Sequence, residues 1–291
     1  MVSASESRPE SEYYSLVARQ ANHPGQVITV TENPLCPPIN ATNTTTSTTG
    51  PNGSLFFLSC GISLSRRTRG KWDPPNITIS DLVINVDFSS VEATKGTLFE
   101  PCAPYLDAFH NASAAIGVPP ILFAAFAMQE SGCNPDATGS GGTAGLLQLS
   151  TDKCKDVNCY DPFTNIQIGA AYLQTLLSAS PNIVLAVGSW NGWFAGMTYA
   201  DATAVRYTDC YSQRNLDYLH QYFNGWLQGI NAYGQSGIGD RLGYYFNLDV
   251  CDHGGFPTWG VSGTAPKLQF IFGFKRLFLF GLFLARVIDL A

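Results

Sequence analysis

The chain changes character near Cys102, because from there to Cys251 apolar residues recur with the period of a helix. The stretch "PYLDAFHNASAAIGV" predicts a helix that ends before Pro119. The next run, "ILFAAFAMQES", is apolar on all sides and predicts a helix buried in the centre of a domain. Proline is tolerated in a first helical turn and glycine often follows a last one. We therefore expect this helix to begin at Pro119-Pro120 and to stop at Gly132.

Three further helices are predicted downstream. Asp161 is a good N-cap and Pro162 a good first residue for a helix in "DPFTNIQIGAAYLQTLLSAS". A shorter helix is expected in "NIVLAVGSW", and another in "NLDYLHQYFNGWLQGI", whose apolar residues share one face. Together these patterns predict a mainly α domain over residues 101–252.

The two ends of the chain have a different pattern. Residues 1–55 are polar and rich in Thr, Asn and Pro, which predicts a disordered, glycosylated segment. Residues 56–100 alternate short β-like runs with turn signals, so we expect a β-like extension there. Residues 253–291 form an apolar tail long enough to cross a bilayer, but Lys275 and Arg276 lie in its middle, where charges are costly. Membrane association through this tail is therefore not favoured.

Eight cysteines occur at irregular spacing, and the chain has no CxxC pair. Four disulfides are the natural interpretation, with their connectivity left open. Five glycosylation sequons agree with an oxidising, extracellular compartment and hence with secretion. The stretch after Met1 has no apolar core of a signal peptide, so we expect the start of the sequence to be incomplete. The sequons begin at Asn40, Asn43, Asn52, Asn76 and Asn111.

Charge excludes some partners and chemistry. The net charge is −6 and only 13% of residues are charged, so the chain has no basic stripe for nucleic acid. Separately, we expect the protein to be a monomer. A serine-nucleophile elbow of the GxSxG type is absent. The four histidines do not have metal-ligand spacing, and "GSGGTAG" lacks the lysine of a phosphate loop. We expect neither a metal nor another cofactor.

Glu130 is the candidate catalytic residue, because it is a lone carboxylate at the end of the apolar helix. Burial and the negative end of the helix dipole both disfavour the charged form, so its pKa should be raised. A carboxyl that stays neutral near pH 6 suits a general acid that protonates a leaving oxygen. The alternative is that Glu130 only faces solvent at a helix end.

Three sequence blocks, in order, resemble the soluble lytic transglycosylases, family 23 of the glycoside hydrolases, over residues 101–230. The first block is "QESGCNPDATGSGGTAGLLQLS", which begins at Gln129. The second is Asn165-Ile166, Gly169 and Tyr172-Leu173, and the third is "GSWNGW", which ends at Trp193. The resemblance implies a lysozyme-like fold and action on peptidoglycan or a related N-acetylated glycan.

The resemblance also implies roles for single residues. Glu130 would be the sole acid and base, and Ser131 would orient its carboxyl. Gln148 would bind the N-acetyl sugar and Asn191 would hydrogen-bond the substrate. Trp190 stands where the family has a tyrosine close to the carboxyl, so a hydroxyl is missing there. The full set of expected substrate-binding residues is Ser131, Gln148, Tyr172, Trp190 and Asn191.

With one carboxylate, the implied reaction ends in a 1,6-anhydromuramyl product instead of hydrolysis. Two alternatives stay open: a goose-type-lysozyme-like muramidase that uses an aspartate-positioned water, and a glycan-binding module without catalysis. A tail-anchored adhesin is a third. Because an acidic protein is repelled by anionic cell walls, we expect an activity optimum below neutral pH.

Overall fold

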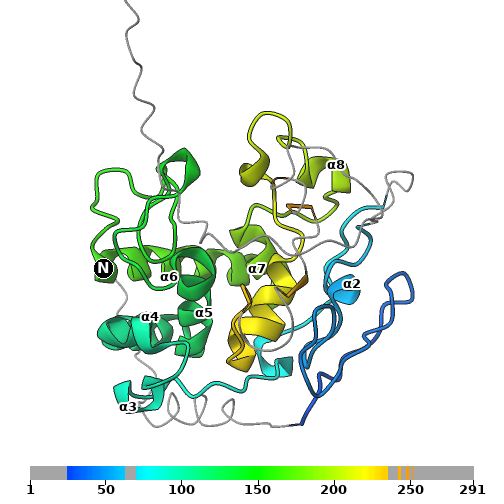
Figure 1. The fold of residues 1–291 in the computed structure, drawn as a ribbon, viewed down its shortest axis with the longest axis horizontal. Coiled ribbons are helices and arrows are strands. Elements are labelled where there is room, and N and C mark those ends of the chain that lie inside the picture. The colour runs from blue at the N-terminus through cyan, green and yellow to red at the C-terminus, as the bar shows by residue number, and fades with distance from the viewer. Residues whose placement is uncertain (1–24, 63–69, 235–241, 244–246, 249–250, 252–291) are drawn as a thin grey trace, which may run out of the picture.

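The computed structural model describes residues 25–62, 70–234, 242–243, 247–248 and 251 (Figure 1). This part of the chain is mainly helical, as the sequence predicts. It contains three isolated β-bridges and no sheet. A single cluster of buried apolar side chains runs from Ile28 to Leu242. The described N-terminal residues therefore share one core with the helices that follow.

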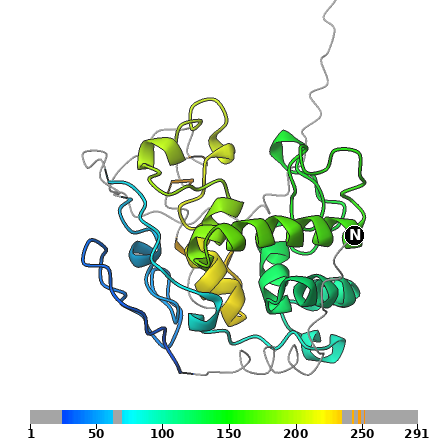
Figure 2. The same ribbon diagram turned by 180° about the vertical axis from the view of Figure 1, so that it is seen from behind.

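Helix α5, Pro120–Ser131, lies in the middle of this core, and the other long helices surround it (Figures 1 and 2). It starts with proline as its first residue, and Gly132 ends it at a φ of 65°. Both ends agree with the sequence prediction. Apart from Met128 and Glu130, every side chain of the helix is buried, as the all-round apolar pattern indicates.

Three more helices pack around α5. Helix α4, Leu106–Ile116, ends at Gly117, which takes a φ of 70°. Helix α6, Pro162–Ala179, is capped by Asp161, whose carboxylate accepts a hydrogen bond from the Thr164 amide at 2.8 Å. Helix α7, Ile183–Trp190, is capped by Asn182. Each of the corresponding sequence predictions is confirmed, because caps depend on residues close in the chain.

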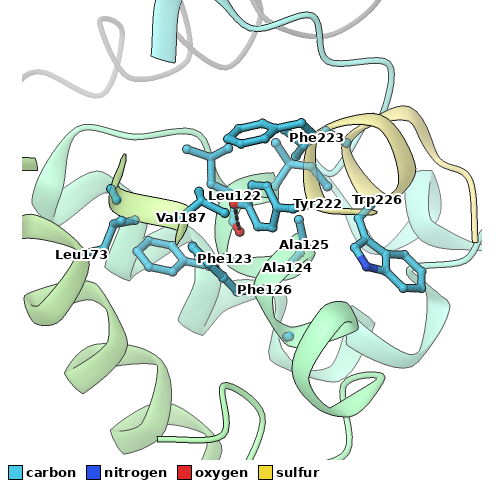
Figure 3. Packing of buried hydrophobic residues seen from close by; sticks show 14 of the residues in the cluster. Leu122, Phe123, Ala124, Ala125, Phe126, Leu173, Val187, Tyr222, Phe223 and Trp226 are labelled. Carbon is cyan, nitrogen blue, oxygen red and sulfur yellow. Dashed lines mark hydrogen bonds between the residues drawn. The ribbon is translucent and has the colours of Figure 1, made fainter. Parts of the chain in front are cut away.

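The last predicted helix is present but irregular. It consists of α9 (Tyr218–His220), the π-helical turn η5 (Gln221–Gly225) and the 3₁₀ turn η6 (Trp226–Gln228). It packs against α5, and the Tyr222 hydroxyl donates to the Leu122 carbonyl at 2.8 Å (Figure 3). All residues from 216 to 227 are buried, so the polar residues of this segment lie inside the protein together with its apolar ones.

The β-like extension is also wrong, since the described residues of 56–100 contain short helical turns and no strand. Their apolar residues pack into the common core; the Trp72 ring, for example, lies against Gly188 of α7. The short elements are α2 (Leu55–Leu58), η1 (Ile79–Asp81), α3 (Val91–Thr94), η2 (Glu100–Tyr105), η3 (Ser140–Gly142), α8 (Tyr199–Ala202) and η4 (Cys210–Ser212).

Residues 25–54 are ordered, which corrects the expected disorder for this part of residues 1–55. Two of their buried polar side chains bond backbone groups of the helix at 218–228. The Thr45 hydroxyl donates to the Asn224 carbonyl at 2.8 Å, and the Asn52 amide group donates to the Phe223 carbonyl at 2.8 Å. Asn52 is fully buried, so this sequon cannot carry a glycan in the folded chain. Buried polar groups are stable where they are hydrogen-bonded, and composition alone does not reveal such partners.

All eight cysteines form disulfides, which settles the connectivity that the sequence leaves open. One bridge, Cys102–Cys133, joins the start of the helical region to the residue after α5's glycine cap. The other pairs are Cys36–Cys60, Cys154–Cys159 and Cys210–Cys251. In the described part of the chain, every helix is too short or too polar to span a bilayer. The expected apolar tail, residues 253–291, lies outside the described residues.

Candidate active site

Glu130 occupies the last turn of α5, where the helix leaves the core. Its side chain is half-buried, and its Oε1 accepts a hydrogen bond from the hydroxyl of Tyr218. Tyr218 is itself buried and comes from α9, 88 residues further along the chain. The carboxyl is thus fixed by a second helix and does not simply face solvent.

Burial raises the pKa of Glu130 from 4.5 to about 7, and the hydrogen bond from Tyr218 lowers it by less. Removal from water disfavours the charged carboxylate, whereas a donor stabilises it. Phe126 lies one turn earlier on α5, and the Trp190 ring stacks on it. At mildly acidic pH, Glu130 is therefore mostly protonated and can give up a proton.

The loop after α5 is held in place by Ser131 and Asn165. The buried Ser131 hydroxyl donates to the Leu146 carbonyl at 2.8 Å and accepts from the Asn134 amide at 3.1 Å. The buried Asn165 amide group donates to two carbonyls, and its oxygen accepts from the Leu147 amide at 2.9 Å. Both side chains bond backbone groups of the loop. Orientation of the Glu130 carboxyl by Ser131 stays a prediction.

Two glycines let the loop approach α6 and α7. Gly145 has a φ of 74°, and a Cβ there would lie 2.2 Å from the Cys159 carbonyl oxygen. At Gly169, a Cβ would lie 2.4 Å from a Leu147 methyl group and 3.2 Å from the Trp190 ring. Residues of all three sequence blocks therefore meet in one place; glycine is required at 145, whereas a Cβ at 169 would require the Leu147 side chain to move.

Gln148 has a different surrounding from the one expected. Its side-chain amide donates to the carbonyls of Ala137 and Gly145, both at 2.9 Å, and its oxygen accepts from the Thr143 hydroxyl at 3.0 Å. These bonds cross-link the glycine-rich loop. Sugar binding by Gln148 stays a prediction: both side-chain N–H groups are engaged, and the oxygen can accept one further hydrogen bond.

Three aromatic rings form a continuous row that begins at Phe126, one helical turn before Glu130. The Trp190 ring stacks on Phe126 with centroids 4.2 Å apart, and Tyr172 lies 5.4 Å from Trp190. Both Trp190 and Tyr172 are half-buried. Aromatic rings with one accessible side are suited to contact the apolar face of a sugar ring, so this row is a candidate substrate surface.

The other residues of the third block divide into two groups. Asn191 is half-buried at the end of α7 and donates to the Asn215 carbonyl at 3.4 Å. Trp193 is buried and packs edge-on against Trp72, with ring centroids 4.9 Å apart. Trp193 therefore serves the core, as expected for a tryptophan outside the site, whereas Asn191 stays a candidate for substrate contact.

Tyr218 is the site residue that sequence reasoning missed. The sequence indicates a hydroxyl lost at Trp190, whereas the structure supplies one from α9. Hydrogen bonds support the neighbouring backbone: the hydroxyl of the half-buried Tyr233 donates to the Gln129 carbonyl at 2.6 Å, and the buried Gln129 amide donates to Gln221 at 2.9 Å. The signal available in the sequence was Gln129, a polar residue in the otherwise apolar helix α5, which indicates a buried hydrogen-bond partner from another segment.

A hydrolase of the muramidase type would need an aspartate to position water, but three aspartates that follow Glu130 in the sequence have other roles or are exposed. Asp136 is exposed in the loop, and its amide donates to the Asn134 side chain at 3.0 Å. Asp152 is exposed beside Lys153, and Asp161 caps α6. A water-activating aspartate is therefore not found among these three.

The family model "Transglycosylase SLT domain" matches residues 107–204. Two curated relatives are called membrane-bound lytic murein transglycosylase F. The protein from Shewanella halifaxensis (strain HAW-EB4) is 39% identical over 79 residues, and that from Histophilus somni (strain 2336) is 36% identical over 81. These matches cover 26% and 27% of this chain and 16% of each relative. The chain therefore matches only a small part of their length.

Solved structures of lytic transglycosylases are also similar over part of the chain. The 70-kDa soluble lytic transglycosylase in complex with bulgecin A is 25% identical with a TM-score of 0.31, over 36% of this chain and 20% of that one. The 70-kDa enzyme from Escherichia coli is 29% identical with a TM-score of 0.30, over 35% and 20%.

Proposed function

Because residues 107–204 belong to the transglycosylase SLT domain family, we propose that this chain is a lytic transglycosylase of peptidoglycan. It would cleave the β-1,4 bond between N-acetylmuramic acid and N-acetylglucosamine. The observation that carries the proposal is the Glu130 carboxyl, whose pKa is raised to about 7 by burial while Tyr218 fixes its position.

In the first step, protonated Glu130 gives its proton to the glycosidic oxygen. The bond from that oxygen to C1 of the muramyl residue then breaks, and the N-acetyl group of the same sugar stabilises the positive charge at C1. The Tyr218 hydroxyl bonds more strongly to a carboxylate than to a carboxylic acid, so it favours the charged Glu130 that this step produces.

In the second step, the Glu130 carboxylate takes the proton of the muramyl 6-hydroxyl. The 6-oxygen bonds to C1, which closes the 1,6-anhydro ring and restores the protonated acid. No water is consumed, so one carboxylate is sufficient. Asp136, Asp152 and Asp161 are exposed or serve as a helix cap, which favours this route over a second-carboxylate hydrolysis.

The products of peptidoglycan digestion test the proposal directly. Mass spectrometry of fragments released by the wild-type chain should show 1,6-anhydromuramic acid ends, and Glu130→Gln should release none. Fragments one water heavier, with reducing ends, would show a muramidase instead. Binding to peptidoglycan without any fragments would make the chain a glycan-binding module.

The pH profile provides a second test. Cleavage should fall as pH rises through about 7, because the first step requires protonated Glu130. In Tyr218→Phe, loss of the donor raises the pKa of Glu130 further, so the basic limb should move to higher pH. The rate itself should drop about 10- to 100-fold, since one hydrogen bond to a charged group is lost.

This prediction is tested by measuring the cleavage rates of the wild-type and Tyr218→Phe chains across the pH range. Tyr222→Phe is the matched control. Tyr222 is a buried tyrosine that bonds the Leu122 carbonyl and not Glu130, so its removal should leave the position of the limb unchanged. A wild-type maximum above about pH 8 would contradict the assigned acid.

The compartment is part of the same proposal. Four disulfides suit an extracellular, secreted protein, because such bonds persist in oxidising surroundings. Four of the five sequons begin at exposed asparagines and remain open to glycosylation, namely Asn40, Asn43, Asn76 and Asn111.

A further inference from the structure

Lys153 extends the row of aromatic rings with a positive charge. Its ammonium nitrogen lies 4.3 Å from the centroid of the Tyr172 ring and 3.2 Å from the Ser150 hydroxyl oxygen. Its side chain is 27% exposed, so the ammonium is partly desolvated but still reachable. A cation over a ring face is attracted by the ring's electrons, and this attraction fixes an otherwise flexible side chain.

A series of ring contacts leads from this ammonium to Phe126, which lies on the same helix as the proposed catalytic residue. Lys153 lies on Tyr172, Tyr172 contacts Trp190, and Trp190 stacks on Phe126. Phe126 precedes Glu130 by one helical turn. A glycan strand that contacts the rings while one of its bonds lies at Glu130 would therefore extend toward Lys153.

The positive charge of Lys153 has few cationic neighbours in the surrounding loop. Residues 132–161 contain two cations, Lys153 and Lys155, and the second is exposed. Asp152 lies 3.7 Å from the Lys153 nitrogen, but its side chain is 77% exposed. Such a solvent-exposed pair contributes little, so the ammonium can exchange Asp152 for a carboxylate of a ligand.

We propose that Lys153, held on the Tyr172 ring, binds a carboxylate carried by the muramyl residues of the glycan. The lactyl group of muramic acid ends in such a carboxylate where no peptide is attached. The site would then prefer strands with free muramyl carboxylates over neutral strands of N-acetylglucosamine. Tyr172 is a positioning residue in this scheme. The inference rests on the proposed function and names a substrate feature for it.

Binding measurements on the Glu130→Gln chain test this without turnover. Three tetrasaccharides serve as probes: one that alternates N-acetylglucosamine and muramic acid with free carboxyls, the same compound with its carboxyls amidated, and a neutral tetramer of N-acetylglucosamine. Calorimetry at low and high salt gives each Kd. Lys153→Gln is compared with Lys155→Gln, which removes the same charge from an exposed neighbour in the same loop.

Lys153→Gln should weaken binding of the free-acid tetrasaccharide about tenfold, the usual loss for one hydrogen bond to a charged group. Binding of the amidated and neutral probes should not change, and Lys155→Gln should leave all three unchanged. High salt should reduce the difference between the acid and its amide. The inference is overturned if Lys153→Gln binds the acid as tightly as the parent, or if it loses all three probes equally.

Two substitutions at Tyr172 separate positioning from folding. Tyr172→Phe keeps the ring under Lys153 and should retain the preference for the free acid. Tyr172→Leu removes the ring and should lose that preference as Lys153→Gln does; because Tyr172 also belongs to the candidate substrate surface, the quantity compared is the ratio of the Kd values for the acid and its amide. A Tyr172→Leu chain that keeps the full preference would show that the ring does not position Lys153.

Turnover of peptidoglycan by the wild-type chain, measured in parallel, distinguishes the two proposals. If fragments with anhydro ends appear but Lys153→Gln binds the free-acid probe as tightly as the parent chain does, only the present inference fails. If no fragments appear and none of the probes is bound, the proposed function fails, and the inference fails with it.

Discussion

Glu130→Gln is expected to lower the rate of glycan cleavage by about 10⁴-fold, the upper end of the range for general acid-base catalysis. The effect is large because in the proposed reaction one carboxyl performs both proton transfers, and an amide can perform neither. The aspartates at 136, 152 and 161 cannot replace it, since they are exposed or serve as a helix cap. Initial rates of release of soluble fragments from peptidoglycan measure the loss.

The matched control is Glu92→Gln, which makes the same change at an exposed glutamate paired only with Lys95. Its rate should equal that of the wild type. Thermal unfolding of the Glu130→Gln chain should show no loss of stability, because glutamine fits the same half-buried position and accepts from Tyr218. A residual rate within tenfold of wild type would mean that another group supplies the proton.

Removal of the Cys102–Cys133 disulfide by a double substitution to alanine should lower the free energy of unfolding by about 4 kcal/mol. The bridge closes a loop with a sequence separation of 31, and opening it gives the unfolded chain more conformational freedom. Both cysteines are buried, so the lost sulfur contacts add to the effect. Urea denaturation followed by circular dichroism measures the change.

The Cys154–Cys159 bridge provides the comparison, because its sequence separation is only 5. Its removal should cost about 2 kcal/mol on the same entropy argument. Equal losses for the two double variants would contradict loop closure as the cause. Loss of the Cys102–Cys133 bridge should also affect the site. Cys133 lies three residues after Glu130, so greater mobility there should lower the cleavage rate.

Local signals in the sequence predicted the helices correctly. Pro120 and Gly132 mark the two ends of α5, and Asp161 marks the start of α6, since caps and breakers act within one turn. The spacing of the three sequence blocks predicted which segments meet, and the Gly145 and Gly169 contacts give the physical reason for two of their positions.

Contacts distant in the chain could not be predicted. Thr45 and Asn224 are 179 residues apart, and nothing in either local pattern indicates the other. Polar composition indicated disorder for residues 1–55, yet the part described, 25–54, is held by hydrogen bonds to buried partners. The same limit hid Tyr218: its hydroxyl gains a role only after the chain returns to the end of α5.

The Tyr218 contact has a consequence for where this protein can be divided. The family match ends at residue 204, whereas the hydroxyl on Glu130 comes from 218. The helix that carries this hydroxyl is tied in turn to Thr45 and Asn52 at the other end of the described chain. A fragment cut at the limits of the family match would keep the acid and lose its donor. The smallest segment that keeps the Glu130 site intact thus extends well beyond residues 107–204, which the family model matches.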